Sequence, residues 1–328
     1  MKQFHFMRAH DAAQAIGTDA RLIAGGTNLL DLMKHQVETP DHLLDINHIG
    51  LESIGRDGDG LWIGALVRNA DLAGDARVRD DYPLLSLAIL CGASPQIRNR
   101  ATTGGNMMQR TRCYYFYDTS SPCNKREPGS GCPAIGGCNR THAIFGTSDQ
   151  CIATYPGDMA VAMTALDATV HIEGPDGSRQ VPAGEFHRLP GTTPQRDTVL
   201  EPGEIISAVT LPPPLGGRQI YRKVRDRRSY AFALVSVAVV LRIEDGRIAT
   251  ARIAAGGVAP RPWRVKAAED ALTGQPAGDQ AFSAAIDAFM QGATGQGQND
   301  FKVPLLRRTL RAVLHEAAGD SAMQEKVA

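Results

Sequence analysis

The chain has 328 residues, 43% of them hydrophobic, which is enough to bury one large core or two to three modest domains. Lysine and arginine together number 35, as do aspartate and glutamate, so the formal net charge is +0 and the basic footprint of a nucleic-acid or anionic-membrane binder is missing. No run approaches the roughly 18 apolar residues of a membrane span, and no apolar signal segment follows Lys2, so we expect a soluble chain that alone stays in the cytoplasm.

The first predicted domain covers residues 1–55. A helix-like stretch at residues 11–20 alternates with short apolar runs at residues 21–26 and 41–46. This alternation predicts a small βαβ-like unit.

The second predicted domain covers residues 56–215. It has strand-like runs, among them residues 168–174 and 204–211, interrupted by helix-like stretches at residues 83–93 and 158–168. The mixture indicates an α+β domain.

A proline- and glycine-rich stretch, residues 211–217, predicts a linker to a third domain, residues 218–328. That domain begins with strand-like runs and ends with amphipathic helices, of which residues 305–318 are the last. The segment 291–300, rich in Gly and Gln, is expected to be an exposed loop.

Two short glycine loops echo one another, at residues 23–32 (IAGGTNLLDL) and 100–109 (RATTGGNMMQ). Each is expected to lie in a similar setting, after a strand and before a helix. Paired glycines allow close backbone approach, so N–H groups, Thr hydroxyls and Asn amides can converge on one pyrophosphate. Neither loop has the dinucleotide-binding or P-loop pattern, and one Gly-Gly pair is more often a simple turn. Pyrophosphate binding and simple turns therefore both stay open as interpretations of these loops.

Five of the six cysteines lie in one polar stretch: Cys113, Cys123, Cys132, Cys138 and Cys151. Disulfides are typical of small secreted domains, and structural zinc usually binds short C-x2–4-C knuckles, which this stretch lacks. An iron–sulfur cluster also needs four thiolates and accepts long, irregular loops between them. The spacing alone only somewhat favours a cluster over zinc or disulfides.

The motifs, taken in order, resemble those of the FAD-binding middle subunits of molybdenum hydroxylases, the group of xanthine dehydrogenase and carbon monoxide dehydrogenase. The resemblance covers nearly the whole chain and rests on residues 23–34, 96–109, 151–168, 203–212 and 221–239. It implies an α+β fold, in which a two-subdomain PCMH-type FAD-binding domain precedes an α+β domain like the C-terminal domain of carbon monoxide dehydrogenase flavoproteins.

The resemblance also implies how FAD is bound. The two glycine loops would enclose the pyrophosphate, Ile206 would pack near the isoalloxazine, and Lys223 would hydrogen-bond the flavin ring. The family's Pro-Ser-Asp motif reads Pro-Gly-Asp here, which keeps Asp158 and loses a hydroxyl. The cofactor residues implied in this way are Ala24, Gly25, Gly26, Thr27, Asn28, Leu29, Leu30, Thr102, Gly105, Asn106, Gln109, Asp158, Ile206 and Lys223.

An insertion at residues 110–157 separates the second glycine loop from that Asp. It resembles the insertion that holds a [4Fe-4S] cluster in the flavin subunits of bacterial periplasmic three-subunit aldehyde oxidoreductases, and a related insertion occurs in 4-hydroxybenzoyl-CoA reductase. Because the insertion begins and ends at flavin-contacting residues, cluster and FAD are expected within electron-tunnelling reach. The implied ligands are Cys113, Cys123, Cys132 and Cys151, with Cys138 spare; exchange of Cys138 for Cys132 or Cys151 is the main alternative.

By resemblance, the chain is the FAD and [4Fe-4S] electron-transfer subunit of a heterotrimeric aldehyde oxidoreductase. A large subunit with a molybdenum cofactor would oxidise the substrate, and [2Fe-2S] centres of a small subunit would pass electrons to this chain and on to an external acceptor. We assign no catalytic residue, because no nucleophile–base pair is visible.

Two other functions remain open on the sequence: a free-standing flavin oxidoreductase with a structural zinc site, and a zinc-stabilised scaffold without redox activity. Nucleic acid and membrane insertion are not expected. Exported relatives cross the membrane folded, carried by a signal on the small subunit, so the resemblance slightly favours the periplasm over the cytoplasm.

Overall fold

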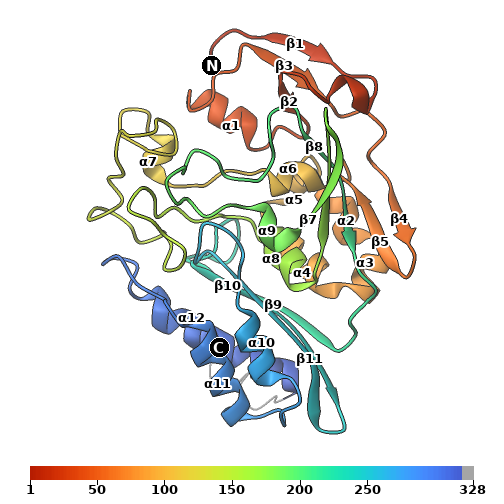
Figure 1. Ribbon diagram of the computed structural model, residues 1–328, viewed down its shortest axis with the longest axis vertical. Coiled ribbons are helices and arrows are strands. Elements are labelled where there is room, and N and C mark those ends of the chain that lie inside the picture. Colours follow the sequence, from red (N-terminus) through yellow and green to blue (C-terminus); the bar gives the residue numbers. More distant parts are fainter. Residues whose placement is uncertain (320–328) are drawn as a thin grey trace.

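The computed structural model describes residues 1–319 and arranges them as three sheets with their own helices, stacked along the long axis of the molecule (Figure 1). None of the helices in this range is long and apolar enough to cross a membrane. The strands are β1 (His5–Arg8), β2 (Arg21–Ile23), β3 (His42–Asp45), β4 (Ile54–Asp57), β5 (Gly60–Gly64), β6 (Thr169–Gly174), β7 (Gly177–Pro182), β8 (Ile205–Leu211), β9 (Arg218–Val224), β10 (Val235–Glu244), β11 (Arg247–Gly256) and β12 (Trp263–Arg264).

The helices are short in the first two thirds of the chain and longer near its end. They are α1 (Leu29–Lys34), α2 (Asn69–Gly74), α3 (Ala76–Asp81), α4 (Pro83–Cys91), α5 (Pro95–Arg98), α6 (Thr103–Met107), α7 (Tyr114–Tyr117), α8 (Met159–Ala165), α9 (Ala183–Phe186), α10 (Lys266–Leu272), α11 (Asp279–Phe289) and α12 (Lys302–Ala318), with one 3-10 turn, η1 (Ala12–Gln14).

The N-terminal sheet is the parallel unit that the sequence predicts, with strand order β1-β3-β2. The helix expected at residues 11–20 is wrong, because this segment forms only the 3-10 turn. Asp11 caps that turn by accepting from the backbone N–H of Gln14, and Gly17 then takes a φ of +72°, in the left-handed region where a helix cannot continue.

The middle sheet has the order β4-β5-β8-β6-β7, and its paired strands are antiparallel. Strand β8 is buried along its whole length, because it lies inside the sheet and contributes to two apolar clusters, one on each side. Helices α2, α3, α4, α8 and α9 supply half of the rest of the larger cluster. The strands and helices expected between residues 56 and 215 therefore assemble around one core.

The C-terminal sheet, order β12-β11-β10-β9, is buried on both faces. Val237 and Val239 of β10 pack toward α10, α11 and α12, whereas Ala238 and Val240 join the core of the middle domain. Because successive side chains of a strand point to opposite faces, a strand covered on both sides can be apolar at successive positions, as β10 is from Val237 to Leu241. The C-terminal domain is thus fixed against the middle domain.

The cysteine-bearing insertion, residues 110–157, contains only the short helix α7 and otherwise consists of turns. In Figure 1 it forms the lobe at left, beside the N-terminal and middle parts and above the C-terminal helices. Lys302, at the start of α12 and fully buried, donates from Nζ to the carbonyl oxygens of Thr141 and His142, at 2.9 and 3.0 Å. The C-terminal domain therefore supports the insertion directly.

The expectation that residues 291–300 form an exposed loop holds for most of that segment but not for Asn299. This residue is fully buried, and its Nδ2 donates to the carbonyl oxygens of His142 and Ala143 at 3.2 and 3.0 Å. The loop is a second support for the insertion, since buried carbonyl groups need such partners.

His187, which follows α9, is buried, and its Nε2 lies 2.8 Å from the carbonyl oxygen of Met107. Its Nδ1 has no hydrogen-bond partner among residues 1–319. Burial lowers the pKa of His187 to about 4. As the pH falls below about 6.5, this histidine is protonated in the unfolded chain before it is protonated in the folded chain, so the folded state loses stability. We expect the free energy of unfolding to fall by up to roughly 3 kcal/mol between about pH 6.5 and pH 4. Denaturant unfolding at a series of pH values measures the slope.

In His187→Gln this part of the pH dependence should disappear. His10→Gln changes an exposed histidine and is the matched control, which should retain it. An unchanged slope in His187→Gln would contradict the assignment.

Candidate functional site

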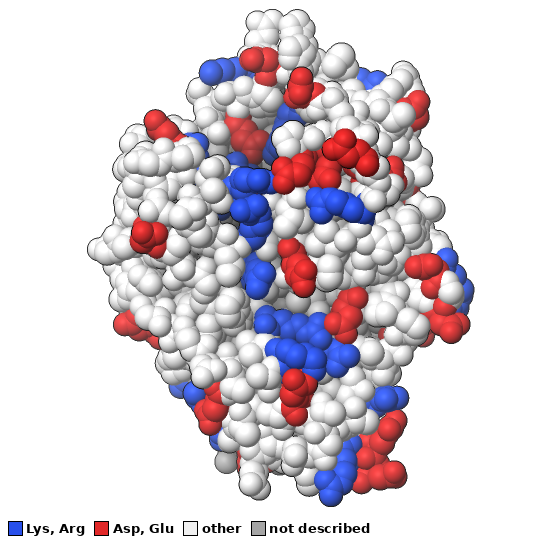
Figure 2. Space-filling model, in the orientation of Figure 1, with Lys and Arg blue, Asp and Glu red and all other residues white. Residues whose placement is uncertain are grey.

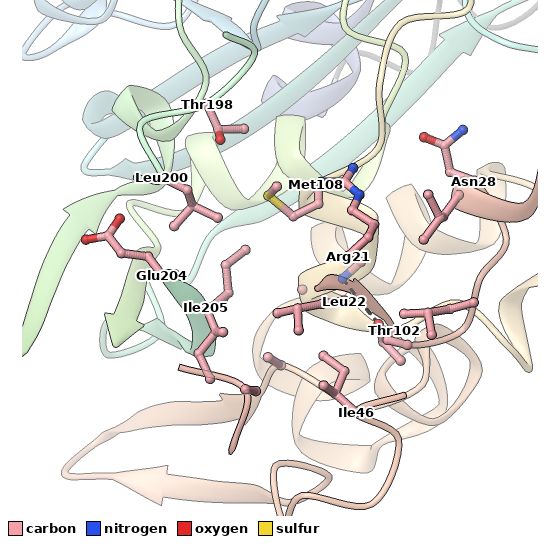
Figure 3. A pocket seen from close by; sticks show the side chains of 18 of the residues that line it. Arg21, Leu22, Asn28, Ile46, Thr102, Met108, Thr198, Leu200, Glu204 and Ile205 are labelled. Atoms are coloured by element: carbon pink, nitrogen blue, oxygen red, sulfur yellow. Dashed lines mark hydrogen bonds between the residues drawn. The ribbon is translucent and has the colours of Figure 1, made fainter. Parts of the chain in front are cut away.

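A cavity of about 830 Å³ lies where the N-terminal sheet meets the middle domain. Cavities of this size hold large organic ligands. Three segments line most of it: the first glycine loop, the second glycine loop and residues 195–206. Figure 3 shows Asn28 and Thr102 on one side of this space, facing Leu200, Glu204 and Ile205 across it.

The first glycine loop connects β2 to α1, as the sequence predicts. Gly26 has a φ of +71°. A Cβ on Gly25 would lie 2.0 Å from the carbonyl oxygen of Arg100, so the backbone of this loop touches the chain that leads into the second loop. Within residues 1–319 the backbone N–H groups of Gly25, Gly26 and Thr27 donate to no other residue, which leaves them for a ligand.

The second glycine loop does not follow a strand, so the expected likeness of setting is wrong. The chain arrives from α5, and Thr102 then caps α6, its Oγ1 accepting from the backbone N–H of Gly105 at 3.2 Å. A Cβ on Gly104 would lie 3.1 Å from Cβ of Ala65, so this glycine allows α6 to pack tightly against the middle sheet. The loop is the first turn of a helix, and it still borders the same cavity.

One half-buried arginine, Arg68, ties the two loops together. Its guanidinium donates to the carbonyl oxygen of Arg100 at 2.6 Å and to Oδ1 of Asn47 at 2.8 Å. Asn47 in turn donates from Nδ2 to the carbonyl oxygen of Ala24 at 2.9 Å. The sequence analysis missed this network, because nothing in the spacing of these residues indicates that they meet.

Where the insertion meets the cavity lies an ion bridge of three buried or half-buried side chains, Arg110, Asp197 and Lys125. Arg110 and Asp197 line the cavity. Nε of Arg110 lies 2.7 Å from one carboxylate oxygen of Asp197, and Nζ of Lys125 lies 2.6 Å from the other. Burial alone would raise the pKa of Asp197, but the charges of Lys125 and Arg110 outweigh it and hold the pKa below its usual range.

On the far side of this bridge, four cysteines line one small pocket within the insertion. They are Cys113, Cys123, Cys132 and Cys151, the first, second and fourth of them buried and Cys132 half-buried. Cys138 is exposed and lies outside this pocket. Within residues 1–319 no group of three or more His, Cys, Asp or Glu side chains is arranged to hold a metal ion.

The thiols in this pocket are difficult to ionise without a positive partner. Burial raises the pKa of Cys113 to about 12. Burial also raises the pKa of Cys151, although the nearby charge of Lys125 acts in the opposite direction. A bound cationic group would supply the missing compensation.

His142 is a further residue of this pocket that the sequence analysis did not single out. Its Nε2 lies 3.1 Å from Sγ of Cys113, and burial, with the charge of Lys302, lowers its pKa to about 4. A neutral imidazole thus contacts the sulfur of Cys113. Lys125 was missed too, although it lies only two residues after Cys123.

The structure brings together nine of the fourteen residues implied at the cofactor, and leaves five outside the cavity lining. Leu30 is exposed on α1. Gln109 donates from its side chain to Asn106 at 2.8 Å, beyond the cavity wall. The nine that line the cavity are Ala24, Gly25, Gly26, Thr27, Asn28, Leu29, Thr102, Gly105 and Ile206.

Asp158 and Lys223, the last two residues implied at the cofactor, form a buried ion pair at the N-terminus of α8. Nζ of Lys223 lies 2.8 Å from Oδ2 of Asp158 and donates to the carbonyl oxygen of Cys91 at 3.2 Å. Tyr221 donates its hydroxyl to Oδ1 of Asp158 at 2.6 Å. A role of Lys223 and Asp158 at the flavin ring therefore stays a prediction.

Comparison with known proteins identifies the family of this fold and cavity. Residues 4–214 match the FAD binding domain in molybdopterin dehydrogenase, and residues 219–317 match the CO dehydrogenase flavoprotein C-terminal domain. The chain belongs to the FAD-binding subunits of the molybdenum hydroxylase family. The family and the α+β fold class predicted from the sequence are confirmed, whereas the individual domain boundaries stay predictions.

The relatives are subunits of oxidoreductases. This FAD-binding subunit is 54% identical over 324 residues to PaoB, the aldehyde oxidoreductase FAD-binding subunit of Escherichia coli K12, a match that covers 97% of this chain and 99% of that one. It is 28% identical to the carbon monoxide dehydrogenase medium chain of Afipia carboxidovorans, over 96% of both. Carbon monoxide dehydrogenase from Hydrogenophaga pseudoflava has the same fold, with a TM-score of 0.75 and 29% identity over 97% of this chain and 98% of that one.

The cavity suits FAD, whose pyrophosphate needs converging donors. The free N–H groups of the first glycine loop and the helix start at Thr102 both border it. Apolar side chains, among them Leu22, Ile46 and Ile206, line other parts of the cavity and can cover the flat ring systems.

Gly25→Ala should weaken FAD binding, because the new Cβ would meet the carbonyl oxygen of Arg100 and force the two glycine loops apart. We expect a loss of about 1–3 kcal/mol in binding free energy, the usual cost of overpacking, measured by fluorescence titration of the purified chain with FAD. Gly55→Ala is the matched control, since nothing lies within 4 Å of a Cβ at that position. Equal FAD affinity in Gly25→Ala and the unaltered chain would show that the loops do not act as described.

Proposed function

We propose that this chain is the FAD and [4Fe-4S] electron-transfer subunit of a molybdenum-cofactor aldehyde oxidoreductase. The observation that carries the proposal is the placement of two sites side by side. A cavity suited to FAD and a pocket lined by four cysteines share the Arg110–Asp197–Lys125 bridge as their wall. Iron–sulfur clusters are held by four thiolates and transfer single electrons. Because the two sites share this wall, a cluster bound in the cysteine pocket would lie next to the flavin.

The placement of the cysteines supports a cluster. Cys113, Cys123 and Cys151 are buried and converge with Cys132 on one pocket, which brings together the four thiolates that a cluster needs. The insertion lacks the short C-x2–4-C knuckles that are usual in structural zinc sites. All six cysteines are free thiols.

The chain's own residues bind, orient and insulate these groups. Arg68 holds the two glycine loops at a fixed separation, and the ion bridge closes the cavity on the side of the insertion. Lys302 and Asn299 fix the insertion from the C-terminal domain. Bound FAD would supply the chemistry of accepting and releasing electrons.

The partners follow from the same proposal. A large subunit with the molybdenum cofactor would oxidise an aldehyde, and a small subunit with [2Fe-2S] centres would deliver the electrons, giving a heterotrimer that reduces an external acceptor. The names of the relatives support a multi-subunit enzyme: PaoB is an FAD-binding subunit, and the carbon monoxide dehydrogenase chains are medium chains.

We also propose a periplasmic location, reached by export together with a partner that carries the signal. Fractionation of cells that produce the tagged chain, with and without the two partner subunits, tests this. The chain should reach the periplasm only when the partners are present; cytoplasmic retention in both cases would refute export.

The cysteine assignment is tested by substitution of single cysteines, with iron, acid-labile sulfide and FAD measured after anaerobic purification. The unaltered chain should contain about four iron, about four sulfide and about one FAD. Ser substitutions at the four proposed ligands should each remove most of the iron, because a cluster needs all four thiolates. These positions are Cys113, Cys123, Cys132 and Cys151.

Cys138→Ser is the matched control, since it removes an exposed thiol from the same insertion. It should retain the iron. If Cys138→Ser loses its iron and one of the other four variants retains it, Cys138 is a ligand in place of that cysteine. Zinc without sulfide in the unaltered chain would refute the cluster.

A further inference from the structure

Lys125 is an unusual residue to find in the wall of the cysteine pocket, because it is a buried cation. Only 8% of its surface is exposed. Its ammonium group contacts the carbonyl oxygen of Pro194 at 2.7 Å and Oδ1 of Asp197 at 2.6 Å. Lysine is rarely buried unless it is paired, and a buried charge acts on its surroundings with little screening by solvent.

The positive charge of Lys125 is only partly neutralised by its ion pair. Asp197 offers its second carboxylate oxygen to Arg110, so one negative charge serves two cations. Glu38 lies 3.1 Å from Arg110, on the cavity side of the bridge, and is itself 3.0 Å from Arg21. The Arg110–Asp197–Lys125 bridge thus carries one net positive charge, with its lysine at the cysteine pocket.

Basic side chains are prominent on the face of the molecule that Figure 2 displays. In Figure 2, Lys and Arg side chains form a column along the middle of the displayed face, next to the mostly uncharged surface at left, where Figure 1 places the insertion. The displayed face of the insertion carries only scattered charged side chains.

We propose that Lys125 sets the reduction potential of the cluster in the cysteine pocket, and that Asp197 determines how much of its charge acts there. The proposal rests on the proposed function, since it requires the cluster. Reduction adds one electron to a group that four thiolates already make negative, and no proton needs to follow. A fixed cation beside that group stabilises the reduced form more than the oxidised form, and so raises the potential.

A purely structural role for Lys125 would have different consequences. An ion pair that only joins the insertion to residues 194–197 would affect unfolding or iron retention, and would leave the potential of a retained cluster unchanged. The potential therefore separates the two roles.

The experiment is a potentiometric titration of the anaerobically purified full chain with dithionite, in which the reduced cluster is quantified by its electron paramagnetic resonance signal. In Lys125→Met the equilibrium constant for reduction should fall about tenfold or more, which for one electron is a shift of about 59 mV to more negative potential. Lys125→Arg keeps the charge and should restore the potential. Lys266→Met removes an exposed lysine from α10 and should cause no shift.

Asp197→Asn tests the same electrostatic effect in the opposite direction. It removes the negative charge and keeps an oxygen that can accept from Lys125, so the potential should rise. If Lys125→Met loses its iron, this variant decides: a rise supports the proposal, and no change refutes it.

The outcomes separate this proposal from the proposed function. Absence of iron and sulfide from the unaltered chain refutes the proposed function. Normal iron content in Lys125→Met with an unchanged potential leaves the proposed function intact and overturns the role of Lys125.

Discussion

A single carboxylate, Asp197, joins the two sites of this chain. One of its oxygens contacts Arg110 in the wall of the flavin cavity, and the other contacts Lys125 in the wall of the cysteine pocket. Each of the two cations would be costly to bury alone, and the carboxylate would be costly to bury without them. The contact among these three charges therefore joins the insertion to residues 194–197 and places the two sites next to each other.

The other supports of the sites follow the same logic of satisfying buried polar groups. Arg68 contacts the backbone of the second glycine loop directly and that of the first through Asn47. Lys302 donates to three carbonyl oxygens, two in the insertion and that of Gly257. The insertion has almost no secondary structure of its own, so its backbone needs partners from outside. Regular elements thus hold an irregular segment in a defined position.

Much of the fold could be predicted from the sequence, because it rests on local patterns. The parallel N-terminal unit, the buried strand β8 and the long apolar strand β10 all appear as runs of the expected period. The wrong expectations also came from local patterns. The stretch at residues 11–20 looks helical, but it forms only the 3-10 turn Ala12–Gln14, and Gly17, with a φ of +72°, prevents a longer helix. The second glycine loop looks like the first one, although it follows helix α5 and not a strand.

The glycine loops and the cysteines were visible in the sequence, but the residues that connect them were not. Arg68, Asn47 and Asp197 are ordinary polar residues in sequence, and each becomes important only through partners that are far away along the chain. Lys223 illustrates the reverse case, because family resemblance gives it a role at the flavin while the structure pairs it with Asp158. Long-range polar networks leave no periodic signal, so reasoning from one sequence cannot find them.

The central claim is that an iron–sulfur cluster and FAD lie on opposite sides of Asp197. The most direct test is a crystal structure of the anaerobically purified chain, with anomalous diffraction data collected on both sides of the iron absorption edge. The account predicts iron density within the pocket of Cys113, Cys123, Cys132 and Cys151, and FAD in the cavity beside Arg110. A single metal ion bound through Cys138, or disulfides in place of the cluster, would contradict it.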